Sequence, residues 1–221
     1  MVNILLTNGI LIHIIFIGFN LRRTYAATML RRRMRKEEYM SHTGYALGVN
    51  CGITFAGLKP ASLFWLRDEQ CTDMPYYRRL FGKRDFRFIT VRSVRGRKLY
   101  YVFNRKMLQG VLSDPNIGNF LRSLGYSDTS LGGALGELRR RLEGEGDFPH
   151  EVGLFLGYPL EDVEGFIRDA RGGICLSCGY WKVYGCPEGR ARLFSRYNRC
   201  SQCIVNKMLS GIPLERIFKL Q

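Results

Sequence analysis

Two β-rich stretches in the middle of the chain constrain its fold most. They cover residues 86–92 (FRFITVR) and 99–105 (LYYVFNR), and Gly96 lies in the short connection between them. Runs of β-branched and aromatic residues joined by a short, glycine-containing link are typical of a β-hairpin. We therefore predict an antiparallel hairpin at this point of the chain.

Helical patterns account for much of the remainder. Asp114 followed by Pro115 is a cap and first residue of the kind that begins a helix, and leucines repeat at helical spacing from 131 to 142. The apolar stretch 57–66 is predicted to be a short buried helix with Pro60 in its first turn. Further predicted elements are helices near 149–156, 160–170 and 187–198 and a strand over 180–184. This order of elements favours an α+β fold.

The composition is that of a folded domain. The chain has 221 residues, of which 46% are hydrophobic, which is too many for intrinsic disorder. Residues 41–221 contain no internal repeat and no clear linker, so we predict a single compact domain with a β-hairpin, several short helices and a Cys-rich C-terminal part. The formal net charge of +15 is compatible with a negatively charged partner and says nothing about the fold.

Residues 1–40 form an apolar and basic N-terminal extension. The apolar run 4–19 is shorter than the roughly 20 residues that span a bilayer. A secretory signal carries its positive charges before the apolar run, whereas the basic cluster here, at 31–36, follows it. We expect no stable membrane span. The extension is either a weak anchor that leaves the main domain in the cytosol or a mis-assigned start, with translation beginning at Met29, Met34 or Met40.

Two cysteine pairs of identical spacing lie near the end of the chain. Cys175 and Cys178 form one C-x2-C pair, and Cys200 and Cys203 form a second after 21 intervening residues. Two-residue spacing lets both sulfurs of a pair turn toward one ion, and four thiolates around Zn²⁺ make a closed structural site. Cysteine thiolates also hold iron–sulfur clusters, so zinc, an iron–sulfur cluster and free thiols all stay open.

Residues between the two pairs extend this prediction. Cys186 could replace one metal ligand, and the arginines between 190 and 199 would offset the negative charge of a tetrathiolate centre. Tyr180, Trp181 and Lys182 could line a pocket beside the metal, although aromatic residues there are more often part of a core.

Three phrases of the sequence carry a resemblance. They are 51–64 (CGITFAGLKPASLF), 148–167 (FPHEVGLFLGYPLEDVEGFI) and 178–185 (CGYWKVYG). Together they are similar to a family of uncharacterised proteins of anaerobic Gram-positive bacteria, known only as a domain of unknown function, over about residues 45–203. The resemblance implies a cytosolic bacterial protein linked to iron or redox physiology, with iron-transport components or a flavodoxin as partners.

The cysteines agree with the family only in part. Cys51, His150, Glu151, Cys178 and Cys200 occupy positions of the family's motifs. Cys203 and Cys186 have no counterpart in its general pattern, so the four-cysteine site is not implied by the resemblance. The first 40 residues also lie outside it.

Cys51 and His150 are the candidates for a thiol enzyme. Cys51 precedes the helix predicted over 57–66, and a helix N-terminus makes a thiolate more available. His150 would be the base, with Asp147 one turn away a better orienting group than the adjacent Glu151. We favour the alternative, in which Cys51 is a buried small residue and His150 belongs to the first turn of a helix.

The basic and aromatic segment 76–106 offers a nucleic-acid interpretation. A strand surface with stacking rings and flanking cations suits single-stranded nucleic acid. The ordinary interpretation, which we favour, is that strand alternation turns many rings into the core and leaves the arginines in solvent. The candidate nucleic-acid contacts are Arg87, Arg92, Arg95, Arg97, Lys98 and Tyr100.

The prediction is therefore a cytoplasmic metal-thiolate protein of α+β fold. It would bind one zinc ion or iron–sulfur centre through the paired C-x2-C motifs and act as an accessory in iron or redox handling. Enzymatic turnover is not favoured. A thiol enzyme using Cys51 with His150, and a zinc-stapled protein that binds nucleic acid through residues 76–106, are the alternatives.

Overall fold

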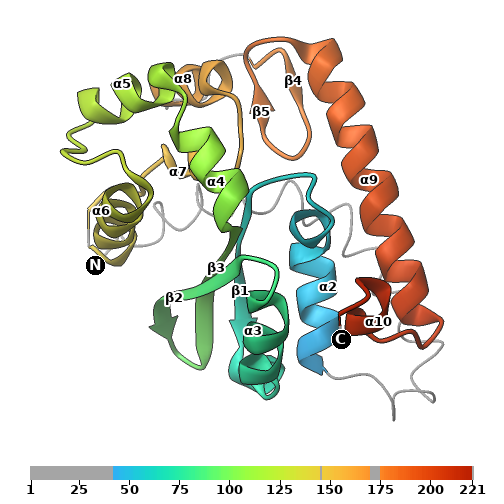
Figure 1. Cartoon of the computed structure of the whole chain (residues 1–221). Coiled ribbons are helices and arrows are strands. Elements are labelled where there is room, and N and C mark those ends of the chain that lie inside the picture. Colours follow the sequence, from blue (N-terminus) through green and yellow to red (C-terminus); the bar gives the residue numbers. More distant parts are fainter. Residues whose placement is uncertain (1–41, 145, 170–174, 221) are drawn as a thin grey trace.

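The computed structural model describes residues 42–144, 146–169 and 175–220 (Figure 1). Helices and strands are mixed, with a small antiparallel sheet at the centre, and the predicted α+β fold is confirmed. The N-terminal extension 1–40, with the anchor or alternative starts predicted for it, lies outside the described residues. Within the described part, no helix is both long and apolar enough to cross a bilayer.

The central sheet contains the predicted hairpin. Its strands are β1 (Ala61–Arg67), β2 (Phe86–Val94) and β3 (Arg97–Asn104), arranged in the order β1-β3-β2 with both pairs antiparallel. Arg95 and Gly96 connect β2 to β3 with φ angles of 46° and 73°. Positive φ at both central positions is typical of the hairpin turn whose twist matches that of the strands, and glycine adopts it without a steric penalty.

Strand alternation divides the apolar side chains between the two faces of the sheet. On β1, Leu63 faces one cluster of apolar residues and Phe64 faces another, and their partners across the ladder, Tyr101 and Tyr100, follow the same division. Both faces are covered, so few sheet residues other than those near the hairpin turn reach solvent.

Five helices pack together in the apolar cluster on the first face of the sheet, and α4 and α6 contact its strands. Three begin at caps that the sequence supplies: Asn104, Asp114 and Ser130 accept hydrogen bonds from the backbone N–H groups of Met107, Asn116 and Gly133. The predicted helix start at Asp114-Pro115 and the leucine stripe after 131 are thereby confirmed. The five helices are α4 (Arg105–Leu112), α5 (Pro115–Ser123), α6 (Leu131–Glu143), α7 (Val152–Phe155) and α8 (Leu160–Arg168).

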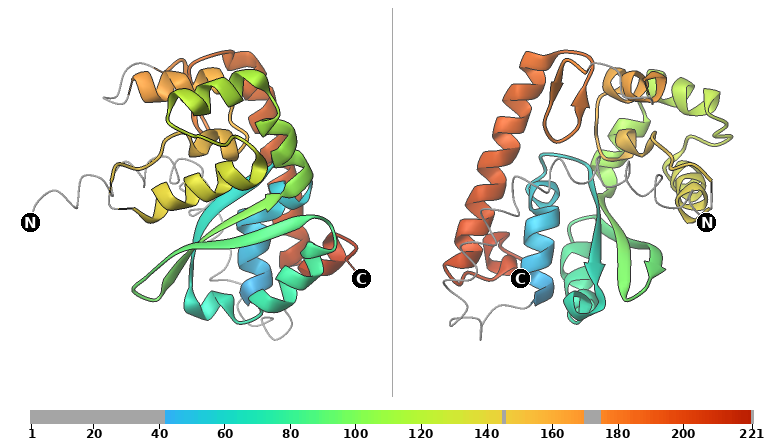
Figure 2. Two further views of the ribbon diagram at one scale, coloured as in Figure 1. Left: turned by 60° about the vertical axis from the view of Figure 1, so that its left-hand side comes forward. Right: turned by 180° about the vertical axis from the view of Figure 1, so that it is seen from behind.

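The second face is covered by helices from both ends of the described chain. In the view from behind, α9, α2, the sheet and α6 follow one another across the molecule (Figure 2). A small hairpin of two strands lies beside α9 (Figure 1). These elements are α2 (His42–Phe55), the 3-10 helix η2 (Asp68–Cys71), α3 (Met74–Gly82), α9 (Pro187–Leu209), α10 (Leu214–Ile217), and the strands β4 (Ser177–Cys178) and β5 (Lys182–Val183).

Three predicted elements need correction. The helix expected over 57–66 is wrong, because β1 occupies 61–67. A strand buried on both faces is apolar at nearly every position, so its sequence cannot be told from a buried helix by periodicity alone. The strand expected over 180–184 shrinks to the two residues of β5, and the helix expected to end near 198 continues to Leu209.

Candidate thiol site on the β4–β5 hairpin

A buried carboxylate fixes the β4–β5 hairpin in place. Asp162 on α8 accepts hydrogen bonds from Trp181 Nε1 (2.8 Å) and from the backbone N–H groups of Tyr184 (2.8 Å) and Gly185 (2.9 Å). Arg190 on α9 donates to the same carboxylate through Nε at 2.9 Å. One side chain therefore joins α8, the hairpin and the first turn of α9.

The electrostatics of Asp162 follow from these bonds. Burial alone would raise the pKa of its carboxyl group. The donors from Trp181, the two backbone amides and Arg190 stabilise the charged form, and the pKa is lowered as a result. Asp162 is thus a satisfied structural anion. It has no free acceptor position facing solvent that would suit catalysis.

Trp181 belongs to the core, which corrects the predicted pocket. Its indole is 5% exposed, stacks on Tyr158 with ring centroids 4.3 Å apart, and meets Phe194 edge-on at 4.6 Å. Tyr180 is also committed, because its hydroxyl donates to Asn198 Oδ1 at 3.0 Å. Of the three residues, only Lys182 stands directly across the strand pair from a candidate thiol, Cys178.

Cys175 and Cys178 are brought together on this hairpin. Cys178 is exposed and Cys175 half-buried, and both are free thiols. Desolvation and the charge of Cys175 raise the pKa of the Cys178 thiol, while Lys182 opposes the rise. Because the charge of one thiolate disfavours ionisation of the other, a bound cation would let both ionise together.

Cys200 and Cys203 do not join that pair. Cys200 packs against the apolar cluster between α2 and the sheet, and Cys203 is exposed. The hairpin contacts α9 at Phe194, Tyr197 and Asn198, all of which precede Cys200 on the helix. Among the described residues, no group of three or more His, Cys, Asp and Glu side chains could hold an ion. The four-thiolate centre stays a prediction that the described arrangement does not assemble.

Cys186 also stands apart from the hairpin pair. It is the N-cap of α9, and its sulfur accepts from the backbone N–H of Gly189 at 3.4 Å. Its side chain is exposed. This geometry explains Cys186 as a helix-capping residue, and its predicted role as a substitute ligand remains untested.

The pairing of Cys51 with His150 is corrected by the structure. Cys51 lies inside α2, well after its first turn, and is fully buried. Burial raises the pKa of its thiol, with Lys59 and a hydrogen bond to Ser62 opposing the rise only in part. A buried thiol of raised pKa is a poor nucleophile. No contact within the described residues joins Cys51 to His150.

His150 sits in an aromatic environment next to the hairpin. Its ring meets Phe148 and Phe166 edge-on, with centroids 6.0 Å and 5.0 Å away, and Lys182 Nζ lies 5.8 Å from the centre of the Phe166 ring. Desolvation lowers the pKa of His150, against the opposing charges of Glu151 and Asp147. Its Nδ1 and the Tyr184 hydroxyl are buried without a hydrogen-bond partner in the described structure.

The rings proposed for nucleic-acid stacking are mostly buried. Tyr100 is 3% exposed, and the other aromatic residues of β2 and β3 also face the two cores. Tyr76 on α3 is the one ring of segment 76–106 that is exposed to a large extent, at 43%. The candidate cations Arg87, Arg92, Arg95 and Arg97 are exposed, and Lys98 pairs with Asp68 at 3.1 Å. A stacking platform is therefore absent from this described segment.

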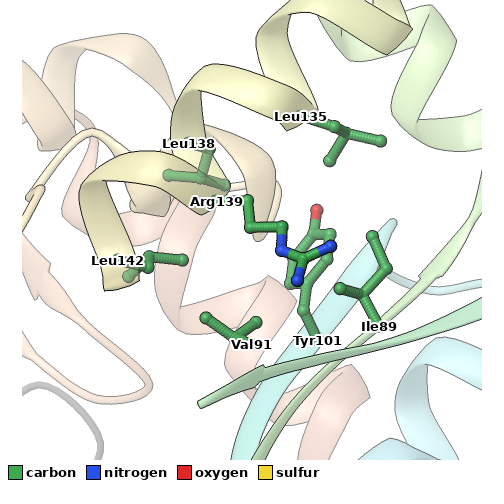
Figure 3. A pocket seen from close by; sticks show the side chains of 7 residues that line it. All are labelled: Ile89, Val91, Tyr101, Leu135, Leu138, Arg139 and Leu142. Atoms are coloured by element: carbon green, nitrogen blue, oxygen red, sulfur yellow. The ribbon is translucent and has the colours of Figure 1, made fainter. Parts of the chain in front are cut away.

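A hollow between α6 and the sheet offers no catalytic chemistry. Its volume is about 10 Å³, which is too small for a substrate, and it is lined mainly by aliphatic side chains (Figure 3). Its two polar groups are engaged, because the Tyr101 hydroxyl donates to the Phe155 carbonyl at 2.8 Å and Arg139 pairs with Glu143 at 2.8 Å. The lining residues are Ile89, Val91, Tyr101, Leu135, Leu138, Arg139 and Leu142.

Comparison with known proteins places the fold and its hairpin in one family. The sequence profile of a family described as "Protein of unknown function (DUF3793)" matches residues 47–218. The chain belongs to the DUF3793 family. The DUF3793 match includes most of α2, the central sheet and both cysteine pairs. No curated protein and no solved structure matches the chain at a significant level.

The sequence alone does not identify Asp162 and Tyr184 as residues of this site. Asp162 is one of several acidic residues on α8, and nothing local shows that it alone is buried. Its donors lie 19 to 28 residues further along the chain. Tyr184 is likewise one aromatic residue among many. The only available signal is the position of Asp162 beside the apolar residue Val163 on a helix that must pack on one face.

Proposed function

We propose that the protein is a metal-thiolate protein, accessory to iron or redox handling, in which Cys175 and Cys178 hold one thiophilic ion at an open site. The observation that carries the proposal is the pairing of these two free thiols on a hairpin that is anchored by Asp162. A ligand that is held by its surroundings loses little conformational freedom when it binds an ion, and Cys178 lies on the strand β4, which pairs with β5.

The chemistry of the pair supports a thiophilic ion. Thiolates favour zinc, copper(I) and iron–sulfur centres over the hard cations that carboxylates bind. The positive charge of a bound ion would offset the repulsion between the Cys175 and Cys178 thiolates. The nearby ammonium group of Lys182 already contributes in the same sense.

Two protein ligands leave coordination positions of a tetrahedral ion open. Closed structural zinc sites use four protein ligands, whereas sites that exchange or react keep at least one position free. An open two-thiolate site suits an accessory protein that receives an ion from one molecule and passes it to another by ligand exchange. Iron-transport components and a flavodoxin are the partners that the resemblance implies, and a reducing cytosol would keep the thiols available.

The test is a metal count on anaerobically purified protein, with a visible spectrum. Wild-type protein should carry up to one metal per chain. The double variant C175S/C178S should lose it, and C200S/C203S should retain it. Cys71→Ser is the matched control, because Cys71 lies on η2, outside the hairpin. An absorption band near 400 nm with bound iron would identify a cluster, and a colourless zinc protein would identify zinc.

Three results would overturn this assignment. Wild-type protein that is folded and free of metal would remove the metal role. Loss of the metal in C200S/C203S as well would replace the open site with a closed four-thiolate centre. Retention of the metal in C175S/C178S would place the ion elsewhere. Reconstitution with Co²⁺ provides a second readout, because its charge-transfer bands respond to the number of thiolate ligands.

A further inference from the structure

The outward face of α9 carries a row of cations. Four basic residues and one cysteine recur there at intervals of four, three, four and four residues, and each side chain is exposed. At 100° per residue, this spacing places all five along one side of the helix. The five residues are Arg192, Arg196, Arg199, Cys203 and Lys207.

The opposite side of the same helix is the one that packs. Its buried residues recur at intervals of three and four, and they contact the β4–β5 hairpin in the first half of α9 and α2 in the second half. The row of cations therefore faces away from the body of the fold. The buried residues are Phe194, Tyr197, Ser201, Ile204 and Met208.

No described acidic side chain forms an ion pair with these cations. The chain has no Asp or Glu from residue 189 to 214. Elsewhere the fold neutralises several arginines: Arg190 pairs with Asp162 and Glu161, and the three arginines of α6 all pair with glutamates. Exposed arginines without a described acidic partner also occur at the β2–β3 hairpin, at Arg92, Arg95 and Arg97, so α9 is distinguished by the regular spacing of its cations along one side of a helix.

The remaining exposed groups on α9 are hydrogen-bonding ones. Between 191 and 207, Ala191 and Cys203 are the only exposed side chains without a strongly polar group. A helix that lies in a membrane surface needs a broad apolar face, which is missing here. Arginine, asparagine, glutamine and serine are side chains that donate to phosphate and sugar oxygens. The exposed neutral polar residues are Ser195, Asn198, Gln202 and Asn206.

We propose that the outward face of α9 binds the phosphodiester backbone of a nucleic acid. The cations from Arg192 to Lys207 extend over about 22 Å of helix axis, at 1.5 Å per residue. A nucleic-acid strand presents several phosphates over that length. The contact is to the backbone, so it carries little sequence specificity, and it needs no stacking rings. The binding surface shares no residue with the metal site proposed on the hairpin.

The experiment measures binding of the full chain to two fluorescent probes, a single-stranded RNA and a duplex DNA, by anisotropy over a series of salt concentrations. The variant R192Q/R196Q/R199Q removes three charges from α9. The matched control R79Q/R92Q/R97Q removes three exposed charges from α3 and the β2–β3 hairpin. The two probes show which nucleic acid is preferred.

The α9 variant should bind more weakly at every salt concentration. The slope of log K against log salt should fall by about 2 to 3, because each lost phosphate contact removes about 0.7 to 0.9 from the slope. The control variant should keep the wild-type slope. Circular dichroism and thermal unfolding should show both variants folded, since all six side chains lie on the surface.

Three outcomes would overturn the inference. The first is no binding to either probe at low salt. The second is an equal loss in both variants, which would indicate net charge and not this surface. The third is equally tight binding to vesicles of an anionic phospholipid, with the same loss in the α9 variant, which would make a lipid surface the partner.

Discussion

The indole Nε1 of Trp181 donates to the buried carboxylate of Asp162 at 2.8 Å. This bond holds the hairpin that carries Cys175 and Cys178 against α8. Arg190 donates to the same carboxylate, so an uncharged side chain of the same shape as Asp162 would keep hydrogen-bond acceptors but would leave Arg190 without its counter-charge.

Replacing Asp162 with Asn should destabilise the fold by about 3 kcal/mol, because it leaves Arg190 without its buried counter-charge. Chemical denaturation followed by tryptophan fluorescence measures the change. Glu161→Gln is the matched control: Glu161 also pairs with Arg190 but is more than half exposed, so its loss should cost less than about 1 kcal/mol. Equal losses in the two variants would contradict the central role of Asp162.

The contribution of Asp162 should disappear in acid. The pKa of its carboxyl group is lower in the folded protein than in the unfolded chain. A group of lowered pKa contributes its full stability above the unfolded value, near 3.9, and loses it as pH falls through the folded value. The difference in unfolding free energy between wild type and Asp162→Asn should therefore be constant from pH 7 to about 5 and shrink below pH 4. A difference that grows toward acid would refute this assignment.

Adding a side chain at Gly52 should crowd the contact between α2 and Ile204 of α9. A Cβ at this position would lie 2.9 Å from Ile204 Cδ1, closer than such atoms approach in folded proteins. Gly52→Val should cost about 1 to 3 kcal/mol, as overpacking of a core does. Gly136→Ala on α6 is the control, because open space surrounds that position and its helix should gain up to about 1 kcal/mol. Thermal unfolding of both variants gives the comparison.

The thiols should divide into two classes by reactivity. Exposed Cys178, Cys186 and Cys203 should react with a thiol reagent in the folded, metal-free protein, whereas Cys51 should react only after unfolding. Burial and a raised pKa both protect Cys51. Mass spectrometry of partially alkylated protein assigns each site. Rapid labelling of Cys51 at neutral pH would reopen the thiol-enzyme alternative.

The predictable parts of the fold are those with local causes. The β2–β3 hairpin follows from composition and from Gly96, and the start of α5 follows from the Asp114 cap. Strand β1 is misread as a helix because it is buried on both faces and shows no alternation. The length of α9 is underestimated at 198, although its buried residues repeat at helical spacing up to Met208.

The candidate site is less predictable because it depends on contacts that are distant in sequence. The C-x2-C spacing places Cys175 and Cys178 at the start of one hairpin and Cys200 and Cys203 on one helix, and their joint role as metal ligands stays a prediction. Spacing alone cannot show that α9 turns Cys200 toward α2 while the hairpin packs elsewhere on the helix. The same limit applies to Asp162, whose donors come from the β4–β5 hairpin and from α9.

Helix α9 is a single rod whose first half touches the hairpin through Phe194 and whose second half touches α2 through Ile204. If binding of an ion at the hairpin displaces α9, it would also alter the affinity of the outward face of α9 for a nucleic acid. Thermodynamic reciprocity then requires the nucleic acid to change the affinity for the ion by the same factor, so release of the ion and release of the nucleic acid would be coupled.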